Sequence, residues 1–561
     1  MKKISIDELR NDIIGNDSLY KTPFGEMNLF YADYTASGRA LGAIENNIMN
    51  ILKSYANTHT TDDFSGKFMT SLLYNAEEKI KQMINAGSDY KLISTGSGCT
   101  GALQKLQEIL GIYIPPHTKD RIFSSLKGLN CKNCSVLEKI NIDRPVVFIG
   151  PYEHHTNELM WREAFAEIVV IELDRDGGID RIMLEKELKK EKYKDRVKYC
   201  SFSAGSNITG MLTDTASLAE IAHANGAQIF FDFAAVAPYV EIDVTGKGQG
   251  YFDAVFFSPH KFLGGPGTAG ILVFHKKLYR ADLPPTTAGG GTVDYVGFRH
   301  HDYSADIETR EKAGTPPIIQ TIKAAMVMEL KNSIGLHTIE EIENKNKEKF
   351  FSRFSTIDEM VIIGNTDPLK RIPIISFNIK HMDKYLHPRF VTRLLSDLFG
   401  IQSRAGCSCA GPYGHRLLGI DEEKSLKYRN MIINENLSGI KPGWVRINLH
   451  YVFSEEDLEY VFNALEFICI HGAKFLNLYA FDPITAEWRK LGHNEEETVF
   501  SIDNIYDLKS LPLNEISAHR ADNLKRAIDI ASDLKYPDAS DFIAREGLFS
   551  DLSYFYYCHE L

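Results

Sequence analysis

The residue best suited to covalent chemistry is a lysine that follows a short apolar run. Lys261 lies in the segment SPHKFLGGPG, shortly after the run AVFF at 254–257. An amine at the end of a strand, beside glycines that let a ligand approach closely, suits a Schiff base with an aldehyde cofactor. Since most lysines are solvated surface charges, an ordinary surface position is the alternative for Lys261 taken alone.

Two other apolar runs end in groups that would complement such a cofactor. Asp232 closes the run AQIFFD, where a buried carboxylate needs a cationic or donor partner. A protonated pyridine nitrogen would be such a partner, and a helix cap is the alternative use of Asp232. Cys99 and Thr100 lie in TGSGCTG, between a predicted strand and a predicted helix. Backbone N–H groups at a helix start form a cradle for phosphate.

Histidine and asparagine follow two further apolar runs. His154 lies in EHHTNE after VVFIG, where an imidazole could stack on a flat cofactor and exchange protons near neutral pH. Asn207 follows KYCSFSAGS and could bond the phenolic oxygen of the cofactor. A surface histidine pair and a turn asparagine are the respective alternatives.

A third group of candidate catalytic and substrate-binding residues lies late in the chain. Cys407 and Cys409 share the glycine-containing segment SRAGCSCAGPYG, and Arg446 lies in WVRINLHY. The planar fork of arginine suits a carboxylate, although a salt bridge to a neighbouring acid would also explain Arg446. The eight cysteines of the chain are too scattered for a disulfide framework. Cys131 and Cys134 have the spacing of only half a zinc site, so no metal is expected.

The elements that must position these residues form an α/β pattern. Between Tyr31 and Tyr279, short apolar runs alternate with helical patterns such as DTASLAEIAHANG. This alternation predicts a large domain with a mostly parallel sheet, whose ligands bind beyond the carboxyl ends of the strands. The later segments predict a smaller α+β domain. The predicted divisions are an N-terminal segment 1–30, a large domain 31–325, a small domain 326–473 and an extension 474–561 of unknown role.

The composition favours a globular protein that acts on a small molecule. The chain has 561 residues, 44% of them hydrophobic and 25% charged, with a formal net charge of −12. Because phosphate backbones need a concentrated basic surface, nucleic acid is not expected as a partner. The N-terminus lacks the apolar core of a signal peptide, and no apolar run is long enough to cross a membrane. We therefore expect a cytoplasmic protein without a membrane partner.

Taken together, the motifs resemble the class V aminotransferase-like, fold-type I enzymes that use pyridoxal 5'-phosphate. Within them the chain is similar to the cysteine desulfurase and selenocysteine lyase group, over roughly residues 31–472. The motifs occur in the family's order and spacing: YADYTASG, GCTGA, EHHTNELMW, SNITG, FFDFAA, SPHKFLGGPGTAG, EKAGTPP and SRAGCSCAG. The sequence GCSCAG is also similar to the desulfurase portion of molybdenum cofactor sulfurases.

The resemblance implies a role for each candidate residue. Lys261 would form the Schiff base, Asp232 would pair with the ring nitrogen, His154 would stack on the ring and Asn207 would contact its phenolic side. Arg446 and Arg404 would bind the substrate carboxylate, with Arg446 as the stronger candidate. The remaining cofactor contacts are to the phosphate, from Cys99, Thr100, Ser258 and His260, and from Thr315 to the phosphate of a partner subunit, which implies a homodimer.

The implied activity is that of a cysteine desulfurase. Sulfur from L-cysteine would pass to Cys409 as a persulfide, L-alanine would leave, and a protein acceptor could collect the sulfur. Ala235 stands where most cysteine desulfurases have glutamine, so the electronics of this site differ from theirs. The alternatives are an aminotransferase, an epimerase or a selenocysteine lyase of the same family, and a non-catalytic sulfur-relay or assembly protein. Cys407 is an additional thiol that either relays sulfur or has no role.

Overall fold

The computed structural model describes the chain except for residues 1–4, 129–143, 494–501, 504–507 and 546. Two compact units divide the described residues. Unit 1 comprises Ser37–Ser206 and Met211–Leu336, and unit 2 comprises the N-terminal segment through Ala36, Asn207–Gly210 and His337–Leu561. Cys131 and Cys134, for which no metal is expected, lie outside the described residues.

Unit 1 is built on a sheet of seven strands in the order β4-β10-β9-β8-β7-β5-β6. All neighbours pair in parallel except β10, which is antiparallel to both β4 and β9. The strands are β4 (Tyr90–Thr95), β5 (Val146–Ile149), β6 (Glu167–Val170), β7 (Lys198–Ser203), β8 (Gln228–Asp232), β9 (Ala254–Phe257) and β10 (Gly270–His275). The predicted α/β class with a mostly parallel sheet is therefore confirmed.

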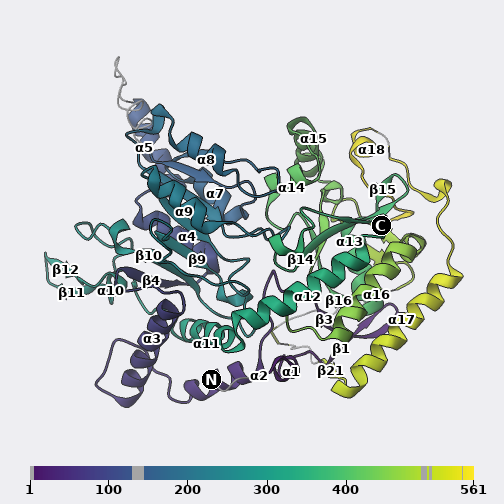
Figure 1. Ribbon diagram of the computed structural model, residues 1–561, viewed down its shortest axis with the longest axis horizontal. Coiled ribbons are helices and arrows are strands. Elements are labelled where there is room, and N and C mark those ends of the chain that lie inside the picture. Colours follow the sequence, from purple (N-terminus) through teal and green to yellow (C-terminus); the bar gives the residue numbers. More distant parts are fainter. Residues whose placement is uncertain (1–4, 129–143, 494–501, 504–507, 546) are drawn as a thin grey trace. The chain divides into compact units, whose positions relative to one another are not determined.

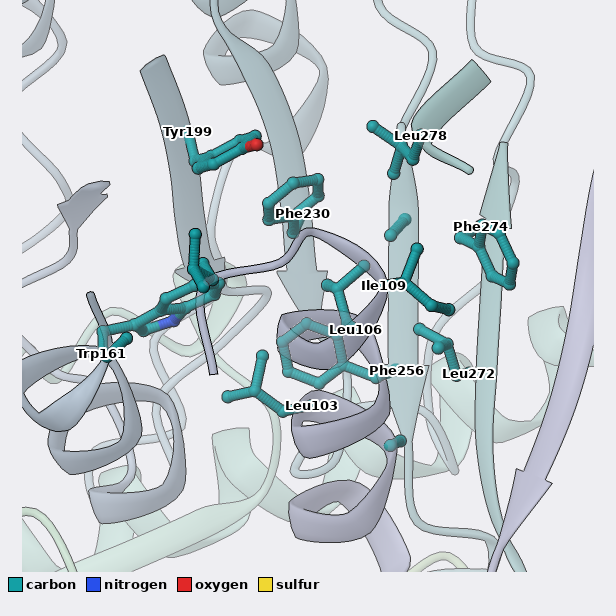
Figure 2. Packing of buried hydrophobic residues seen from close by; sticks show 14 of the residues in the cluster. Leu103, Leu106, Ile109, Trp161, Tyr199, Phe230, Phe256, Leu272, Phe274 and Leu278 are labelled. Carbon is teal, nitrogen blue, oxygen red and sulfur yellow. The ribbon is translucent and has the colours of Figure 1, made fainter. Parts of the chain in front are cut away.

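Helices cover this sheet, so its central strands are buried on both faces. That is why they appear in the sequence as continuous apolar runs rather than alternating ones. Figure 2 shows Leu103 and Leu106 of α4 (Gly98–Ile109) facing Phe256 and Leu272 of the sheet. The other helices of unit 1 include α2 (Gly42–Leu52), α3 (Phe64–Met83), α5 (Pro116–Gly128), α7 (His155–Glu163), α8 (Arg181–Leu188), α9 (Thr215–Ala224), α10 (Ile307–Arg310) and α11 (Ile318–Ile334). The predicted boundary at residue 325 falls inside α11, which lies wholly within unit 1.

Unit 2 contains an antiparallel sheet in the order β13-β14-β18-β17, with β15 paired to β14. Its strands are β13 (Met360–Ile362), β14 (Ile374–His381), β15 (Lys384–Tyr385), β17 (Arg404–Gly406) and β18 (Trp444–Asn448). Helices α13 (Pro388–Phe399) and α16 (Glu455–His471) contact each other (Figure 1). Ser454 caps the start of α16, because its Oγ accepts the Asp457 N–H at 3.0 Å. Helices α14 (Gly411–Leu417) and α15 (Glu422–Ile433) follow the cysteine segment.

Described residues near both termini belong to unit 2. Strands β1 (Ser18–Thr22) and β2 (Gly25–Asn28) form a sheet with β21 (Lys509–Ser510) of the tail. The buried Arg520 of α17 (Ile516–Asp533) donates to Asp457 at 2.6 Å and to Asn28 at 2.9 Å. The tail that the sequence left as an extension of unknown role is thus integrated into unit 2. Within the described part of the chain, no helix is both long and apolar enough to cross a membrane.

Candidate active site

Seven of the predicted site residues meet at one edge of the unit 1 sheet. His154 follows β5, Asp232 ends β8, and Ser258, His260 and Lys261 follow β9. Cys99 and Thr100 begin α4, which follows β4. Since the carboxyl ends of parallel strands meet at the same edge, the fold brings these residues to one edge of the sheet. The roles expected for them in cofactor binding and catalysis stay predictions.

The start of α4 forms a cradle with the turn after β9. The Cys99 N–H donates to Ser258 Oγ at 2.8 Å, and the Thr100 and Thr156 hydroxyls lie 2.8 Å apart. Gly98 has a φ of 58°, and a Cβ there would lie 3.0 Å from Ser258 Oγ, so the turn requires glycine. Ser97 makes no side-chain cap, and a Cβ added at Gly96 would meet nothing within 4 Å. An uncapped helix start beside open space fits a phosphate group.

Asp232 is a buried carboxylate at the centre of this edge. Its Oδ1 accepts the Ala234 N–H at 2.8 Å and the Cys99 thiol at 3.2 Å. Burial raises the pKa of Asp232 and, together with the Asp232 charge, holds the pKa of the Cys99 thiol well above its ordinary value. A cationic ring nitrogen would stabilise the ionised carboxylate, so this site fits a pyridinium. Because the Cys99 side chain contacts Asp232, it is the Cys99 backbone that lies at the predicted phosphate cradle.

The segment after β5 places His154 at the start of α7 and buries the preceding residue, Glu153. His154 caps α7, since its Nδ1 accepts the Thr156 N–H at 3.1 Å. With Nδ1 as acceptor, the proton of the neutral imidazole lies on Nε2. Thr156 also contacts Thr100, so α4 and α7 are joined at their N-termini.

Glu153 is a buried residue at this site that was not predicted from the sequence. Its Oε1 accepts the N–H groups of Gly150 at 3.1 Å and Ser203 at 3.0 Å, and its Oε2 accepts from Ser203 Oγ and Asn157 Nδ2 at 2.6 Å. Burial, with a contribution from Asp232, raises the pKa of Glu153 to about 7. Glu153 therefore ties the ends of β5 and β7 together beside His154. The signal available in the sequence was the position of Glu153 between the end of a predicted strand and the pair His154 and His155.

The turn that carries Lys261 is held by close backbone packing. The Lys261 N–H donates to Ser258 O at 3.1 Å, and the Gly38 N–H donates to His260 O at 2.9 Å. A Cβ at Gly38 would lie 1.9 Å from Phe262 O, which explains the glycine of YADYTASG. Burial, reinforced by the Lys261 charge, lowers the pKa of His260 to about 4, so His260 is neutral at pH 7. Thr315 is an exposed residue of unit 1, and Asn57 Nδ2 donates to its hydroxyl at 3.1 Å.

Unit 2 carries the second group of predicted residues. Arg404 of β17 lies directly opposite Arg446 of β18. Both donate to Asp33, Arg446 Nη2 to Oδ1 at 2.9 Å and Arg404 Nε to Oδ2 at 2.7 Å. Burial lowers the pKa of Arg446, and Asp33 opposes that effect. Asp33 follows β3 (Phe30–Tyr31), which pairs with β16 (Ile401–Gln402). Asp33 lies in the motif YADYTASG, but no role was predicted for it from the sequence.

The cysteine loop joins β17 to α14. Cys409 is exposed and Cys407 is half-buried. Ser408 and Cys409 have φ values of 49° and 59°, a left-handed conformation that costs non-glycine residues about 1–2 kcal/mol each. Asn207 Nδ2 donates to Ser408 O at 2.7 Å, and Arg446 Nη1 donates to Asn207 O at 3.0 Å. In unit 2, Asn207 thus links Arg446 to the loop, whereas its predicted contact with the cofactor stays a prediction.

Comparisons with known proteins agree with this description. A model of the aminotransferase class-V family matches residues 30–461. A probable cysteine desulfurase of Halalkalibacterium halodurans is 28% identical over 68% of this chain and 84% of its own length, and one of Streptomyces coelicolor is 26% identical over 68% and 84%. The structure of a cysteine desulfurase from Thermococcus onnurineus, 23% identical, has a TM-score of 0.64 and covers 84% of this chain and 100% of its own. With the strand-end lysine and aspartate of unit 1 inside the matched range, the chain belongs to the class-V aminotransferase family.

Proposed function

We propose that this protein is a pyridoxal-phosphate-dependent cysteine desulfurase. It removes sulfur from L-cysteine, releases L-alanine and holds the sulfur on Cys409 as a persulfide. The observation that carries the proposal is the exposed Cys409 thiol on a loop that Asn207 links to the buried Arg446. The curated relatives named as probable cysteine desulfurases support the same activity.

The residues of unit 1 supply a fitting site for the cofactor. Lys261 would hold it covalently, Asp232 would pair with its ring nitrogen and His154 would cover its ring. Its phosphate would lie at the uncapped start of α4, where Cys99, Thr100, Ser258 and His260 are the candidate contacts. Bound there, pyridoxal phosphate withdraws electrons from the α-carbon of an amino acid.

The chain's own groups would then carry the reaction. Arg446 binds the substrate carboxylate, and the Lys261 amine takes the α-proton. The Cys409 thiolate attacks the substrate sulfur, so an S–S bond forms while the Cβ–S bond breaks. The electron pair of the broken bond stays with the carbon, which takes a proton and becomes the methyl group of alanine. This step needs no external oxidant, because the sulfur moves as a neutral atom from one carbon chain to a thiolate.

The remaining parts of the proposal concern partners. The family resemblance supports a homodimer in which Thr315 reaches the partner subunit's cofactor phosphate, a protein that accepts the sulfur, and a cytoplasmic location. The exposed position of Thr315 agrees with a contact outside its own chain.

Product analysis tests the activity and separates it from the alternatives. Purified protein loaded with pyridoxal phosphate is incubated with L-cysteine, and alanine, D-cysteine and the 2-oxo acid of cysteine are measured. We expect alanine alone, and none from the Lys261→Ala variant. The 2-oxo acid, formed only with an added oxo-acid acceptor, would indicate an aminotransferase, and D-cysteine an epimerase. Alanine from L-selenocysteine but not from L-cysteine would indicate a selenocysteine lyase, and no product at all a non-catalytic protein.

A further inference from the structure

Two arginines of unit 2 occupy an arrangement that is unfavourable by itself. Arg404 and Arg446 are direct cross-strand partners on β17 and β18. Like charges in such positions destabilise a sheet. Asp33 relieves the repulsion, because each of its carboxylate oxygens accepts from one of the two guanidinium groups. The three side chains, Arg404, Asp33 and Arg446, are called the arginine triad below.

The triad is buried at one end and exposed at the other. The side chains of Arg446 and Asp33 are 4% and 8% exposed, whereas that of Arg404 is 50% exposed. Tyr31 also acts on both arginines, and Cys409 acts on Arg404. With two cations and one anion, the triad therefore has a net charge of +1.

Arg446 also retains an unused buried donor. Its Nη1 donates to Asn207 O and its Nη2 to Asp33, but its Nε has no hydrogen-bond partner among the described residues. Leaving a buried charged donor unpaired costs more than leaving a neutral one, so the position favours a ligand with a carboxylate. One carboxylate would bring the net charge of the triad to zero.

We propose that Asp33 sets the charge specificity of the substrate site. By neutralising one of the two arginines, Asp33 leaves a single positive charge, which matches an amino acid with one carboxylate and an uncharged side chain. A second negative charge on the side chain of the ligand would lack a partner and would be repelled by Asp33. The inference rests on the proposed function, because it takes Arg446 as the group that binds the substrate carboxylate.

Binding of two probe amino acids tests the inference without turnover. The dissociation constants of L-alanine and L-aspartate are measured by titration calorimetry on the protein loaded with pyridoxal phosphate. L-aspartate differs from L-alanine by one side-chain carboxylate. In Asp33→Asn the net charge of the triad rises to +2, so we expect the preference for alanine over aspartate to fall about tenfold, the effect of one added charge interaction worth about 1.4 kcal/mol. High salt should reduce the part of this change in preference that arises from the exposed Arg404, because salt screens exposed charges most.

Two further variants keep the test decisive. Arg404→Gln removes the exposed cation, so the preference for alanine should rise instead of falling, and this holds even if Asp33→Asn does not fold. Asp397→Asn is the matched control, since Asp397 is a buried acid of unit 2 that accepts from Arg393 at 2.8 Å outside the triad. It should leave the preference unchanged.

The inference is overturned if Asp33→Asn leaves the preference within twofold of the wild type, or if Asp33→Asn and Arg404→Gln shift it in the same direction. The proposed function fails separately. A protein that shows the expected charge preference but forms no alanine from L-cysteine would support the role of Asp33 and contradict the desulfurase activity.

Discussion

At the scale of single residues, burial determines the state of most groups at the edge of the unit 1 sheet. It raises the pKa of Asp232 and of Glu153 and lowers that of His260. The direction follows from the charge of each group, because burial always disfavours the ionised form. Asp232 and Glu153 are thus held ready to bind protons or cations, whereas His260 is held neutral.

Glu153 gives a prediction about pH. Its pKa of about 7 lies above its ordinary value of 4.5, so between these values the folded state binds more protons than the unfolded state. The contribution of Glu153 to stability is therefore full below pH 4.5 and decreases by up to about 3 kcal/mol as the pH rises through 7. Glu153→Gln removes this titration.

We expect the unfolding free energy of the wild type, relative to Glu153→Gln, to decrease between pH 5 and pH 8. Urea unfolding of both proteins at the two pH values measures it. A difference between the two proteins that stays constant over this range would show that Glu153 does not titrate there.

Gly38 gives a prediction about close packing. In Gly38→Ala, the new Cβ would lie 1.9 Å from Phe262 O, in the turn that carries Lys261. Since the obstacle is backbone, the turn must shift, and we expect a loss of more than about 2 kcal/mol in stability together with weaker cofactor binding. Thermal unfolding and the absorbance of the bound cofactor measure both effects. Gly87→Ala is the control, because nothing lies within 4 Å of a Cβ there and the change should be nearly neutral.

At the scale of elements, the cysteine loop depends on a contact from a distant segment. The Asn207 side chain donates to Ser408 O, beside two residues in the left-handed conformation. Losing one such hydrogen bond is worth about 1 kcal/mol, which corresponds to roughly a fivefold change in the opening equilibrium. We therefore expect Asn207→Ala to speed amide hydrogen exchange of residues 407–410 about fivefold.

Hydrogen exchange followed by mass spectrometry measures this effect. Asn434→Ala is a suitable control, because the exposed Asn434 side chain, at the end of α15, donates to Asn430 of the same helix and lies outside the cysteine loop. Unchanged exchange of the loop in Asn207→Ala would show that the loop is held by other contacts.

The local sequence pattern predicted the strands better than it predicted which strands pair with each other. The runs that form β5, β7, β8 and β9 were visible because strands buried on both faces are continuously apolar. The placement of β10 between β4 and β9 was not visible, since pairing between distant segments leaves no local pattern. The same limit applies to the site. Lys261 and Asp232 follow strands and could be found, whereas the role of Asp33 depends on β17 and β18 lying side by side.

At the scale of the whole molecule, the tail, residues 474–561, is an integral part of unit 2. The family model ends at residue 461, yet β19 (Tyr479–Phe481) pairs with β20 (Trp488–Lys490) on one side and with β22 (His559–Glu560), near the C-terminus, on the other. Trp488 is buried, and its ring centroid lies 4.6 Å from that of Phe390 in α13. The tail therefore extends the core of unit 2.

We expect Trp488→Ala to destabilise unit 2 by about 3–5 kcal/mol, the usual loss for a buried aromatic side chain. Thermal and urea unfolding measure the loss. Tyr536→Ala, at an exposed position of the tail, should cost far less. Equal effects of the two substitutions would contradict an integrated tail.

The central claim is that Cys409 receives the sulfur, and mass spectrometry tests it most directly. The protein loaded with pyridoxal phosphate is incubated with L-cysteine, alkylated and digested, and the peptide that contains both Cys407 and Cys409 is fragmented. We predict one added sulfur atom on Cys409, lost in Cys409→Ser and retained in Cys407→Ser. Alanine formation that continues in Cys409→Ser at the wild-type rate, with no sulfur added to Cys409 in the wild type, would contradict the account.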